Sequence, residues 1–248
     1  GPYAITGGLG GLGLRAASML VEGGAPHVLL ASRGGRLVRD GQGLDARLRS
    51  MGAGATVVAC DSADARETNA FLSAQSLTGA LHAAGVGDKG LLVELGAQRL
   101  QWMYASKAMG AWYLQCTAAV DGLETCVLFS SVGSGLGNVG QANYAAGNAC
   151  LDAHALAQRA RGTVACSLQW PLVGGAGMGA AAFAAMDERK VSIAGLAGIS
   201  LEEYAACLGA QLGLGVAVAW SVRIVHRSDV RGLLQDLADP SQPRFVEL

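Results

Sequence analysis

Short apolar runs alternate along the chain with longer amphipathic segments, and turn residues separate the two kinds. Apolar runs of about four to eight residues are typical of buried strands, whereas apolar residues spaced three or four apart indicate helices. The alternation predicts βα units, and therefore a parallel sheet covered by helices on both faces. Strands are expected at 3–6, 27–32, 55–60, 79–85, 126–131, 163–170 and 215–222. Helices are expected at 12–22, 44–51, 97–120, 142–161 and 201–212.

Length and apolar content fit one large α/β domain, and the alternation of strands and helices gives it a Rossmann-like, doubly wound architecture. The chain has 248 residues, of which 51% are hydrophobic, so it can bury a substantial core. Segment 171–198 follows a predicted strand end and is rich in Gly and Ala. Composition leaves two interpretations of it open, a lid over a crevice at the sheet edge and a flexible surface connection.

Charge and cysteine usage narrow the classes of partner and compartment. The formal net charge is -1, so no general field attracts nucleic acid or an anionic membrane. The six cysteines show no CxxC pair or metal-ligand spacing, which favours a reducing, cytoplasmic setting. The long uncharged runs are broken by Gly, Pro, Asn, Gln or Ser, so we expect no membrane span. No basic, apolar segment precedes the first predicted strand, so we expect no cleavable leader.

A glycine-rich turn joins the first predicted strand to the first predicted helix. It reads TGGLGGLG and opens at Thr6. Glycines allow a tight turn and close approach of the backbone to a pyrophosphate, while the helix amino terminus offers free N–H groups. The turn alone is a weak signal, but in this position it predicts a dinucleotide site. The expected contact residues are Thr6, Gly7, Gly8, Leu9, Gly11, Leu12 and Gly13.

The second predicted strand ends at Ser32 and Arg33, where an NAD-preferring domain would carry a carboxylate for the adenosine ribose. An arginine at this point suits a 2′-phosphate, because its planar fork binds phosphate oxygens well. NADPH is therefore favoured over NADH. A solvated loop arginine is the alternative interpretation.

Later strand ends carry further residues that a dinucleotide could contact. Asp61, with Ser62 beside it, is positioned to accept from the adenine amino group, although capping the following helix is an equally good interpretation. His82 is interpreted as a structural histidine rather than a catalyst. The small residues where the cofactor backbone would pass are Ala83, Ala84 and Gly85.

A serine and a tyrosine in the second half of the chain suggest carbonyl reduction. Ser131 ends the fifth predicted strand, and Tyr144 follows near the start of a helix of small residues. The serine hydroxyl can hydrogen-bond a carbonyl oxygen while the tyrosine protonates it. A free tyrosine has a pKa near 10, so a nearby cation is needed. Asn148 stands one turn after Tyr144, where a lysine is usual, so either the site is inactive or the cation comes from elsewhere in the chain.

The stretches TGGLGGLG, HAAG, FSS and GQANYAAGNACLDA together resemble the ketoreductase domain of a modular or iterative type I polyketide synthase. This branch of the short-chain dehydrogenase/reductase superfamily is similar to the chain over essentially its whole length. In that branch asparagine follows the tyrosine by four residues, and the lysine lies on the preceding long helix in a stretch similar to SKAMGAWYL. The resemblance therefore implies a catalytic set of Lys107, Ser131, Tyr144 and Asn148.

Without the resemblance, Lys107 would be interpreted as a solvated surface lysine. The helix expected at 97–120 is apolar on much of its circumference, as in a helix packed against a sheet, so a lysine on it can point into a crevice. Asn148 would hold a water or fix the lysine and tyrosine side chains. A local hydrogen bond is the alternative for this asparagine.

The resemblance implies hydride transfer from NADPH to the β-carbon of a 3-oxoacyl thioester, with Tyr144 protonating the oxygen. The thioester would hang on an acyl carrier protein, beside other domains of a polyketide synthase. The nucleotide-binding half would then cover about 1–90 and the catalytic half about 91–225, with a tail over 226–248. Two alternatives stay open: a free-standing short-chain reductase of a soluble ketone, and a cofactor-binding synthase domain that does not reduce.

The chain departs from the family pattern at several positions. An LDD triplet and a tryptophan eight residues before the tyrosine resemble markers of the two hydroxyl configurations. Here the corresponding positions hold GDK, with Asp88 in the middle, and Leu136, so no product stereochemistry is predicted. The usual WGxW is replaced by Trp170 followed by PLV, and the chain opens at the catalytic first strand rather than with a cofactor-less structural subdomain.

Overall fold

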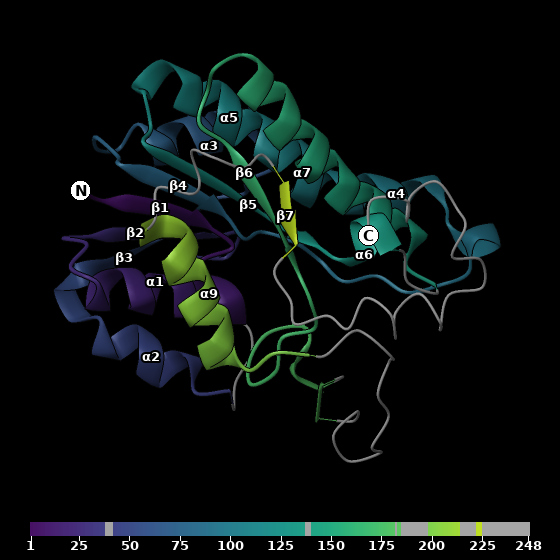
Figure 1. Ribbon diagram of the computed structural model, residues 1–248, viewed down its shortest axis with the longest axis horizontal. Coiled ribbons are helices and arrows are strands. Elements are labelled where there is room, and N and C mark those ends of the chain that lie inside the picture. Colours follow the sequence, from purple (N-terminus) through teal and green to yellow (C-terminus); the bar gives the residue numbers. More distant parts are fainter. Residues whose placement is uncertain (38–41, 137–139, 182, 185–197, 214–221, 225–248) are drawn as a thin grey trace.

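The computed structural model shows one open sheet of parallel strands (Figure 1). It describes residues 1–37, 42–136, 140–181, 183–184, 198–213 and 222–224. The strands are β1 (Tyr3–Thr6), β2 (Val28–Ser32), β3 (Ala55–Ala59), β4 (Gly79–His82), β5 (Thr125–Ser131), β6 (Cys166–Trp170) and β7 (Val222–Ile224). Their order is β3-β2-β1-β4-β5-β6-β7. The chain moves outward from β1 to β3 and then returns to place β4 on the other side of β1, which creates the switch point where such sheets bind ligands.

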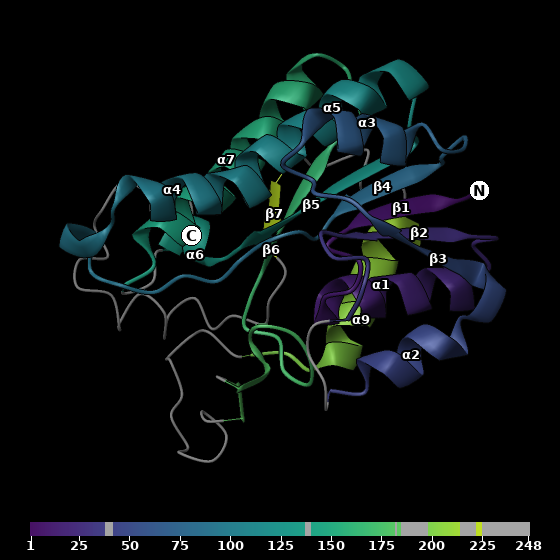
Figure 2. The same cartoon turned by 180° about the vertical axis from the view of Figure 1, so that it is seen from behind.

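Helices cover both faces of the sheet, which confirms the doubly wound architecture predicted from the sequence (Figures 1 and 2). One face carries α1 (Gly11–Glu22), α2 (Leu44–Ser50) and α9 (Leu201–Gly213). The other carries α3 (Ala65–Leu72), α5 (Gly110–Asp121) and α7 (Ala142–Ala160). The shorter elements are η1 (Gly52–Gly54), η2 (Leu92–Glu94), α4 (Ala97–Tyr104), η3 (Ala105–Met109) and α6 (Gly133–Leu136).

The sheet separates two hydrophobic clusters, because successive side chains of a strand point to opposite faces. Ile5 and Val127 belong to the cluster under α1 and α9. Their strand neighbours Ala4 and Leu128 belong to the cluster under α3, α5 and α7. Strands buried on both faces read as continuous apolar runs, which is why the sequence showed them clearly.

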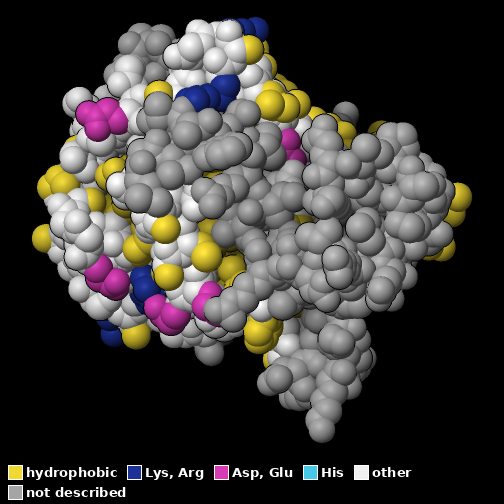
Figure 3. Space-filling model, viewed as in Figure 1, with side chains coloured by type: hydrophobic (Ala, Val, Ile, Leu, Met, Phe, Trp, Pro, Cys, Tyr) yellow, Lys and Arg dark blue, Asp and Glu magenta, His cyan; other side chains and the backbone are white. Residues whose placement is uncertain are grey.

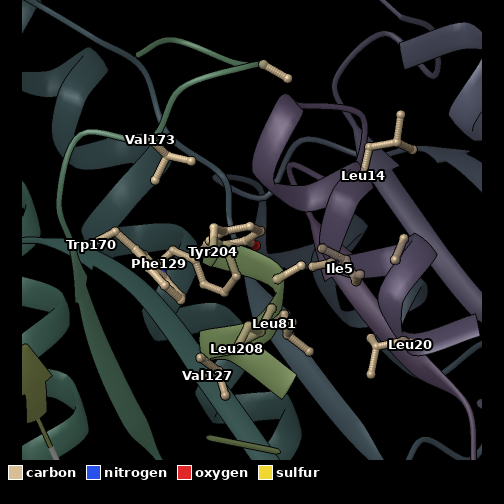
Figure 4. Close-up of a cluster of buried hydrophobic side chains, with 14 of the residues drawn as sticks. Ile5, Leu14, Leu20, Leu81, Val127, Phe129, Trp170, Val173, Tyr204 and Leu208 are labelled. Carbon is tan, nitrogen blue, oxygen red and sulfur yellow. The ribbon is translucent and has the colours of Figure 1, made fainter. Parts of the chain in front are cut away.

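An aromatic group joins the carboxyl ends of β5 and β6 to α9 (Figure 4). The ring centroids of Trp170 and Tyr204 lie 4.6 Å apart, and those of Phe129 and Trp170 lie 5.8 Å apart. The Tyr204 hydroxyl also donates to the Leu12 carbonyl oxygen at 2.9 Å, in the first turn of α1. This packing holds the glycine turn before α1 in a constant position relative to β5, where Ser131 lies.

Some boundaries differ from those expected. The helix predicted at 97–120 is continuous, but residues 105–109 form a π-helical turn between α4 and α5. No range was predicted for helix α3, the helix that follows Asp61; its charged sequence buries only Thr68, Phe71 and Leu72. Most of the strand predicted at 215–222 and all of the tail predicted at 226–248 lie outside the described residues.

The described surface carries charges of both signs. On the face drawn in Figure 3 the described Lys, Arg, Asp and Glu side chains form small, separate groups among apolar and uncharged atoms. Trp102 and Trp112, on the long helix, are each 42% exposed. Among the described residues, no helix combines the length and the apolar character that crossing a membrane requires.

Candidate active site

The carboxyl ends of β1, β4 and β5 meet at one edge of the sheet and bring the candidate residues together. Thr6 pairs with His82 in the β1–β4 register, and His82 pairs with Leu128 in the β4–β5 register. The glycine turn, the segment 83–85 and Ser131 therefore leave the sheet on the same side. This edge contains the switch point between β1 and β4.

The glycine turn between β1 and α1 is built so tightly that side chains are excluded from it. Gly7 has φ +66, a left-handed conformation that favours glycine. A Cβ on Gly13 would collide with the Gly7 carbonyl oxygen, and one on Gly8 would lie 2.9 Å from the Ile5 carbonyl oxygen. Gly10 caps α1 without any side-chain hydrogen bond. The first-turn N–H groups of α1 thus face the loop uncapped by a side chain, an arrangement that fits a pyrophosphate.

The residues expected at the adenosine end lie on neighbouring strand ends. Ser32 ends β2, and its Oγ is buried without a hydrogen-bond partner among the described residues. Arg33, next along the chain, is exposed. An unpaired buried hydroxyl beside an exposed arginine fits the ribose end of a dinucleotide, since buried polar groups otherwise find partners.

The structure decides against one of the two interpretations of Asp61. Asp64, not Asp61, caps α3, and its side chain accepts from the N–H groups of Arg66 and Glu67. Asp61 Oδ1 instead accepts from the Ala63 N–H at 3.0 Å, before the helix begins. The cap interpretation is therefore wrong, and adenine recognition by Asp61 stays a prediction. Ser62 is buried beside it.

His82 is a structural histidine, as its position suggested. It is fully buried, with Nδ1 at 2.7 Å from Thr6 Oγ1 and Nε2 at 3.1 Å from the Lys107 carbonyl oxygen. Burial, and to a smaller extent the charge of Lys107, lower the pKa of His82 to about 3. The ring is therefore neutral near pH 7, and it links β1 and β4 to the π-helical turn.

Lys107 points into the protein from that π-helical turn. Its relative exposure is 4%, and Nζ donates to the Phe129 carbonyl oxygen at 3.0 Å. Nζ also lies 5.5 Å from the centroid of the Tyr144 ring. The surface interpretation of this lysine is thus wrong. Such π turns occur frequently at functional sites, where they change the direction of a side chain on an otherwise regular helix.

Gly85 leaves room for the buried lysine side chain. A Cβ on Gly85 would lie 2.7 Å from Lys107 Cε, closer than real Cβ contacts come. Gly85 belongs to the segment 83–85, which the sequence assigned to the cofactor path. The same small residue therefore also provides space for the cation.

Tyr144 lies in the first turn of α7, close to the side chains of Ser131 and Asn148. Burial raises the pKa of Tyr144, and the neighbouring side chains of Asn148 and Ser131 oppose the rise. The Gly133 N–H donates to Ser131 Oγ at 3.2 Å, which occupies an acceptor position and leaves the hydroxyl hydrogen to donate elsewhere. Burial also lowers the pKa of Lys107 to about 8, while the charge of Asp152 opposes this.

Asn148 makes the local hydrogen bond that was one of its two expected roles, and the other role stays a prediction. Its Nδ2 donates to the Tyr144 carbonyl oxygen at 2.9 Å, so the local hydrogen bond exists. Its Oδ1 is buried and has no hydrogen-bond partner among the described residues. A buried acceptor without a partner can accept a hydrogen bond from a water or from an ammonium group in the site.

Asp152 was missed in the sequence, although it stands one turn beyond Asn148 on α7. Its carboxylate accepts from Ser134 Oγ at 2.7 Å, Ser167 Oγ at 2.6 Å and Gln169 Nε2 at 2.8 Å. These bonds tie α7 to β6 and to the segment that follows Ser131. An acid four residues after Asn148 was the available signal, because that spacing places it on the same helix face.

The described part of segment 171–198 rests on the glycine turn. Val173 and Ile199 form an isolated parallel bridge, so the chain just after β6 lies beside the chain just before α9. A Cβ on Gly11 would collide with the backbone of Ala176 and Gly177. Residues 182 and 185–197 lie outside the described part, and the lid therefore stays a prediction.

Sheet order, glycine turn and buried lysine–tyrosine pair together fit the short-chain dehydrogenase/reductase class of oxidoreductases. The family model described as "KR domain" matches residues 1–175. The chain thus belongs to the ketoreductase domains of type I polyketide synthases, as the sequence resemblance implied.

The curated relatives are long polyketide synthases. The chain is 41% identical over 261 residues to "Polyketide synthase GfsA" of Streptomyces halstedii, with 100% of this chain and 4% of that protein covered. It is 38% identical over 262 residues to "Spectinabilin polyketide synthase system protein NorB" of Streptomyces orinoci, with 98% of this chain and 12% of that protein covered. The chain thus spans a small part of these relatives.

Solved structures of ketoreductases share the fold. "Structure of A-type Ketoreductases from Modular Polyketide Synthase" superposes with a TM-score of 0.82 at 32% identity, with 100% of this chain and 53% of that chain covered. "The first ketoreductase of the tylosin PKS" gives a TM-score of 0.80 at 32% identity, with 100% and 55% covered. This chain therefore spans about half the length of these two solved chains.

Proposed function

We propose that this domain reduces the β-keto group of a 3-oxoacyl thioester to a β-hydroxyacyl thioester, with NADPH as the cofactor and an acyl carrier protein as the bearer of the substrate. Lys107 carries the proposal, because nothing in folding requires a lysine to be buried beside Tyr144. Burial of an ammonium group is costly, so its presence next to a tyrosine, a serine and an asparagine argues for chemistry. A synthase domain that binds cofactor without reducing would gain nothing from a buried ammonium group that offsets the free energy lost by burying it.

Tyr144 is the proposed proton donor to the substrate oxygen, and Ser131 donates a second hydrogen bond to the same atom. The bound nicotinamide supplies the hydride that the carbonyl carbon receives. As the oxygen gains negative charge, the Tyr144 proton moves to it and a phenolate remains. Lys107 stabilises that phenolate through its positive charge, which counteracts the rise in pKa caused by burial. Asn148 Oδ1 is the proposed acceptor of a hydrogen bond from a water or from Lys107. Through that group Tyr144 would regain the proton that it gave to the substrate.

The glycine turn is the proposed pyrophosphate site, with contacts from Thr6, the backbone of 7–13 and the segment 83–85. Ser32 and Arg33 are the proposed contacts of the 2′-phosphate, which supports NADPH over NADH because no carboxylate stands there to repel it. Asp61 and Ser62 are the proposed neighbours of the adenine. These assignments place the cofactor across the switch point between β1 and β4.

The carrier protein and the neighbouring synthase domains are proposed from the relatives, which are polyketide synthases. All six cysteines are free thiols, which supports the reducing cytoplasm as the compartment.

The deciding experiment follows the loss of reduced-nicotinamide absorbance with a 3-oxoacyl group on a carrier protein, on a small thiol and as a soluble ketone. We expect NADPH oxidation to be fastest with the carrier-bound substrate, and chiral analysis of the alcohol gives the configuration. Tyr144→Phe is the control and is expected to lose about 10²–10⁴-fold in rate while it still binds NADPH. Preference for the soluble ketone would favour the free-standing reductase, and binding without turnover would favour the non-reducing domain.

A further inference from the structure

Asp88 lies in the loop after β4 and is held by more donors than a surface carboxylate needs. Its side chain is 13% exposed. Arg99 of α4 binds it with both arms of the guanidinium, from Nε to Oδ2 at 3.0 Å and from Nη2 to Oδ1 at 2.6 Å. The Lys89 N–H donates to Oδ1 at 2.9 Å, and Asn143 Nδ2 donates to Oδ2 at 2.6 Å. The last bond joins the β4 loop to the first turn of α7.

Asn143 connects this carboxylate to the main chain of Tyr144. It is 2% exposed, and its Oδ1 accepts from the Tyr144 N–H at 2.9 Å. A carboxylate only accepts and an N–H only donates, so a single orientation of the amide satisfies both partners. The direction of the amide is therefore determined by Asp88.

The Tyr144 N–H depends on this amide, because it belongs to the first turn of a helix, where backbone acceptors are absent. The N-cap residue of α7, Gln141, makes no capping bond with its side chain. The carbonyl oxygen of Gly140, four residues before Tyr144, accepts instead from the Gly90 N–H at 2.8 Å. The loop 88–90 is thus bonded to 140–143 by backbone as well as by side chains.

We propose that Asp88 and Asn143 are positioning residues for the reduction: Arg99 fixes the Asp88 carboxylate, Asp88 orients the Asn143 amide, and Asn143 fixes the main chain at Tyr144. The inference rests on the proposed function, because Tyr144 is the proton donor there. A misplacement of about 1 Å at a reacting group costs about 10²-fold in rate, so a small shift at this first turn is sufficient to be measured. Neither residue touches the reacting atoms.

Kinetics of a swapped pair test the proposal. Asn143→Asp keeps an acceptor for the Tyr144 N–H but sets a second carboxylate against Asp88, and we expect kcat to fall about 10- to 100-fold with the KM for NADPH unchanged. When Asp88→Asn is added to Asn143→Asp, the pair again has one amide donor and one carboxylate acceptor, now with their positions exchanged. Most of the lost kcat should therefore return. The matched control is Asp45→Asn, which breaks an exposed Asp–Arg pair on α2 whose atoms lie 2.7 Å apart, and it should leave kcat unchanged.

Hydrogen exchange provides a readout that does not need activity. In protein labelled with ¹⁵N-tyrosine, the Tyr144 amide is identified by its absence in Tyr144→Phe. Its exchange should accelerate in Asn143→Ala and in Asp88→Asn, and remain unchanged in Asp45→Asn. If the wild type does not reduce ketones but these amide changes occur, the proposed function fails and the positioning network stands. An active wild type with unchanged kcat in Asn143→Asp, or an unchanged Tyr144 exchange rate in Asn143→Ala, overturns the inference.

Discussion

The Lys107 ammonium lies 5.5 Å from the centroid of the Tyr144 ring, although the two residues come from different helices. Nζ is held by the Phe129 carbonyl oxygen, on the strand that ends in Ser131. A cation at this distance from a phenol ring lowers the energy of the phenolate that proton transfer leaves behind. The predictions that follow depend on this pair and on its neighbours.

Replacing Lys107 by methionine should abolish reduction and stabilise the fold. The pKa of Lys107 falls from its usual 10.5 to about 8 because burial disfavours the charge. At about 1.4 kcal/mol per pKa unit, carrying the charge costs the folded state about 3 kcal/mol. Lys107→Met removes this cost and loses one hydrogen bond, so its free energy of unfolding at pH 7 should exceed that of the wild type.

The sign of the pH dependence distinguishes this stabilisation from simple repacking. Between pH 8 and 10.5 the unfolded state holds more protons at Lys107 than the folded state, so wild-type stability rises with pH through this window. Lys107→Met lacks that contribution. Its advantage in urea unfolding should therefore be largest below pH 8 and shrink toward pH 10.5. An advantage that stays constant across this window would contradict the assignment.

The rate of reduction should decline as the pH rises through about 8, because Lys107 then loses its charge. The pKa of Tyr144 is raised, so the tyrosine keeps its proton in this range. The measurement is kcat against pH with a soluble ketone, which avoids thioester hydrolysis. Lys107→Arg is the control, because arginine stays charged throughout, and its lower rate should not decline in this window.

Gly85→Ala should reduce activity with little effect on stability. The new Cβ would lie 2.7 Å from Lys107 Cε, at the far end of a flexible side chain, so the lysine moves while the fold persists. We expect kcat to fall about 10-fold or more, as for a displaced catalytic group. Gly87→Ala is the matched control, because among the described residues its Cβ would lie within 4 Å of Met178 Sδ alone, at an ordinary 3.5 Å. Equal rates in both variants would show that the lysine tolerates displacement.

Arg33→Ala should weaken NADPH binding about 10-fold or more and leave NADH binding unchanged, because a charge-assisted bond to the 2′-phosphate contributes about 1.5–3 kcal/mol. The dissociation constants of both nucleotides can be measured by fluorescence titration. Arg49→Ala, an exposed arginine on α2, serves as the control for overall charge. A parallel loss for both nucleotides would place Arg33 away from the 2′-phosphate.

Much of the site could be predicted because its residues follow strand ends. Parallel strands align their carboxyl ends at one edge, so the glycine turn, Ser32, residues 83–85 and Ser131 had to meet there. The residue that caps α3 could not be predicted in this way, because Asp61 and Asp64 both precede the helix and both have a side chain suited to an N-cap. Only the backbone geometry showed that Asp64 takes the cap.

The sequence by itself determined the alternation of strands and helices, the glycine turn and the position of Tyr144 in the first turn of a helix, because these depend on local conformational preference and hydrophobic period. Tertiary structure alone decided that Lys107 is buried and that Asp152, Asp88 and Asn143 hold the neighbouring elements. A lysine on a helix looks the same locally whether it meets water or a core. Burial of Lys107 depends on three features: the π-helical turn, the space above Gly85 and the Phe129 carbonyl oxygen. These features come together only through contacts between distant parts of the chain.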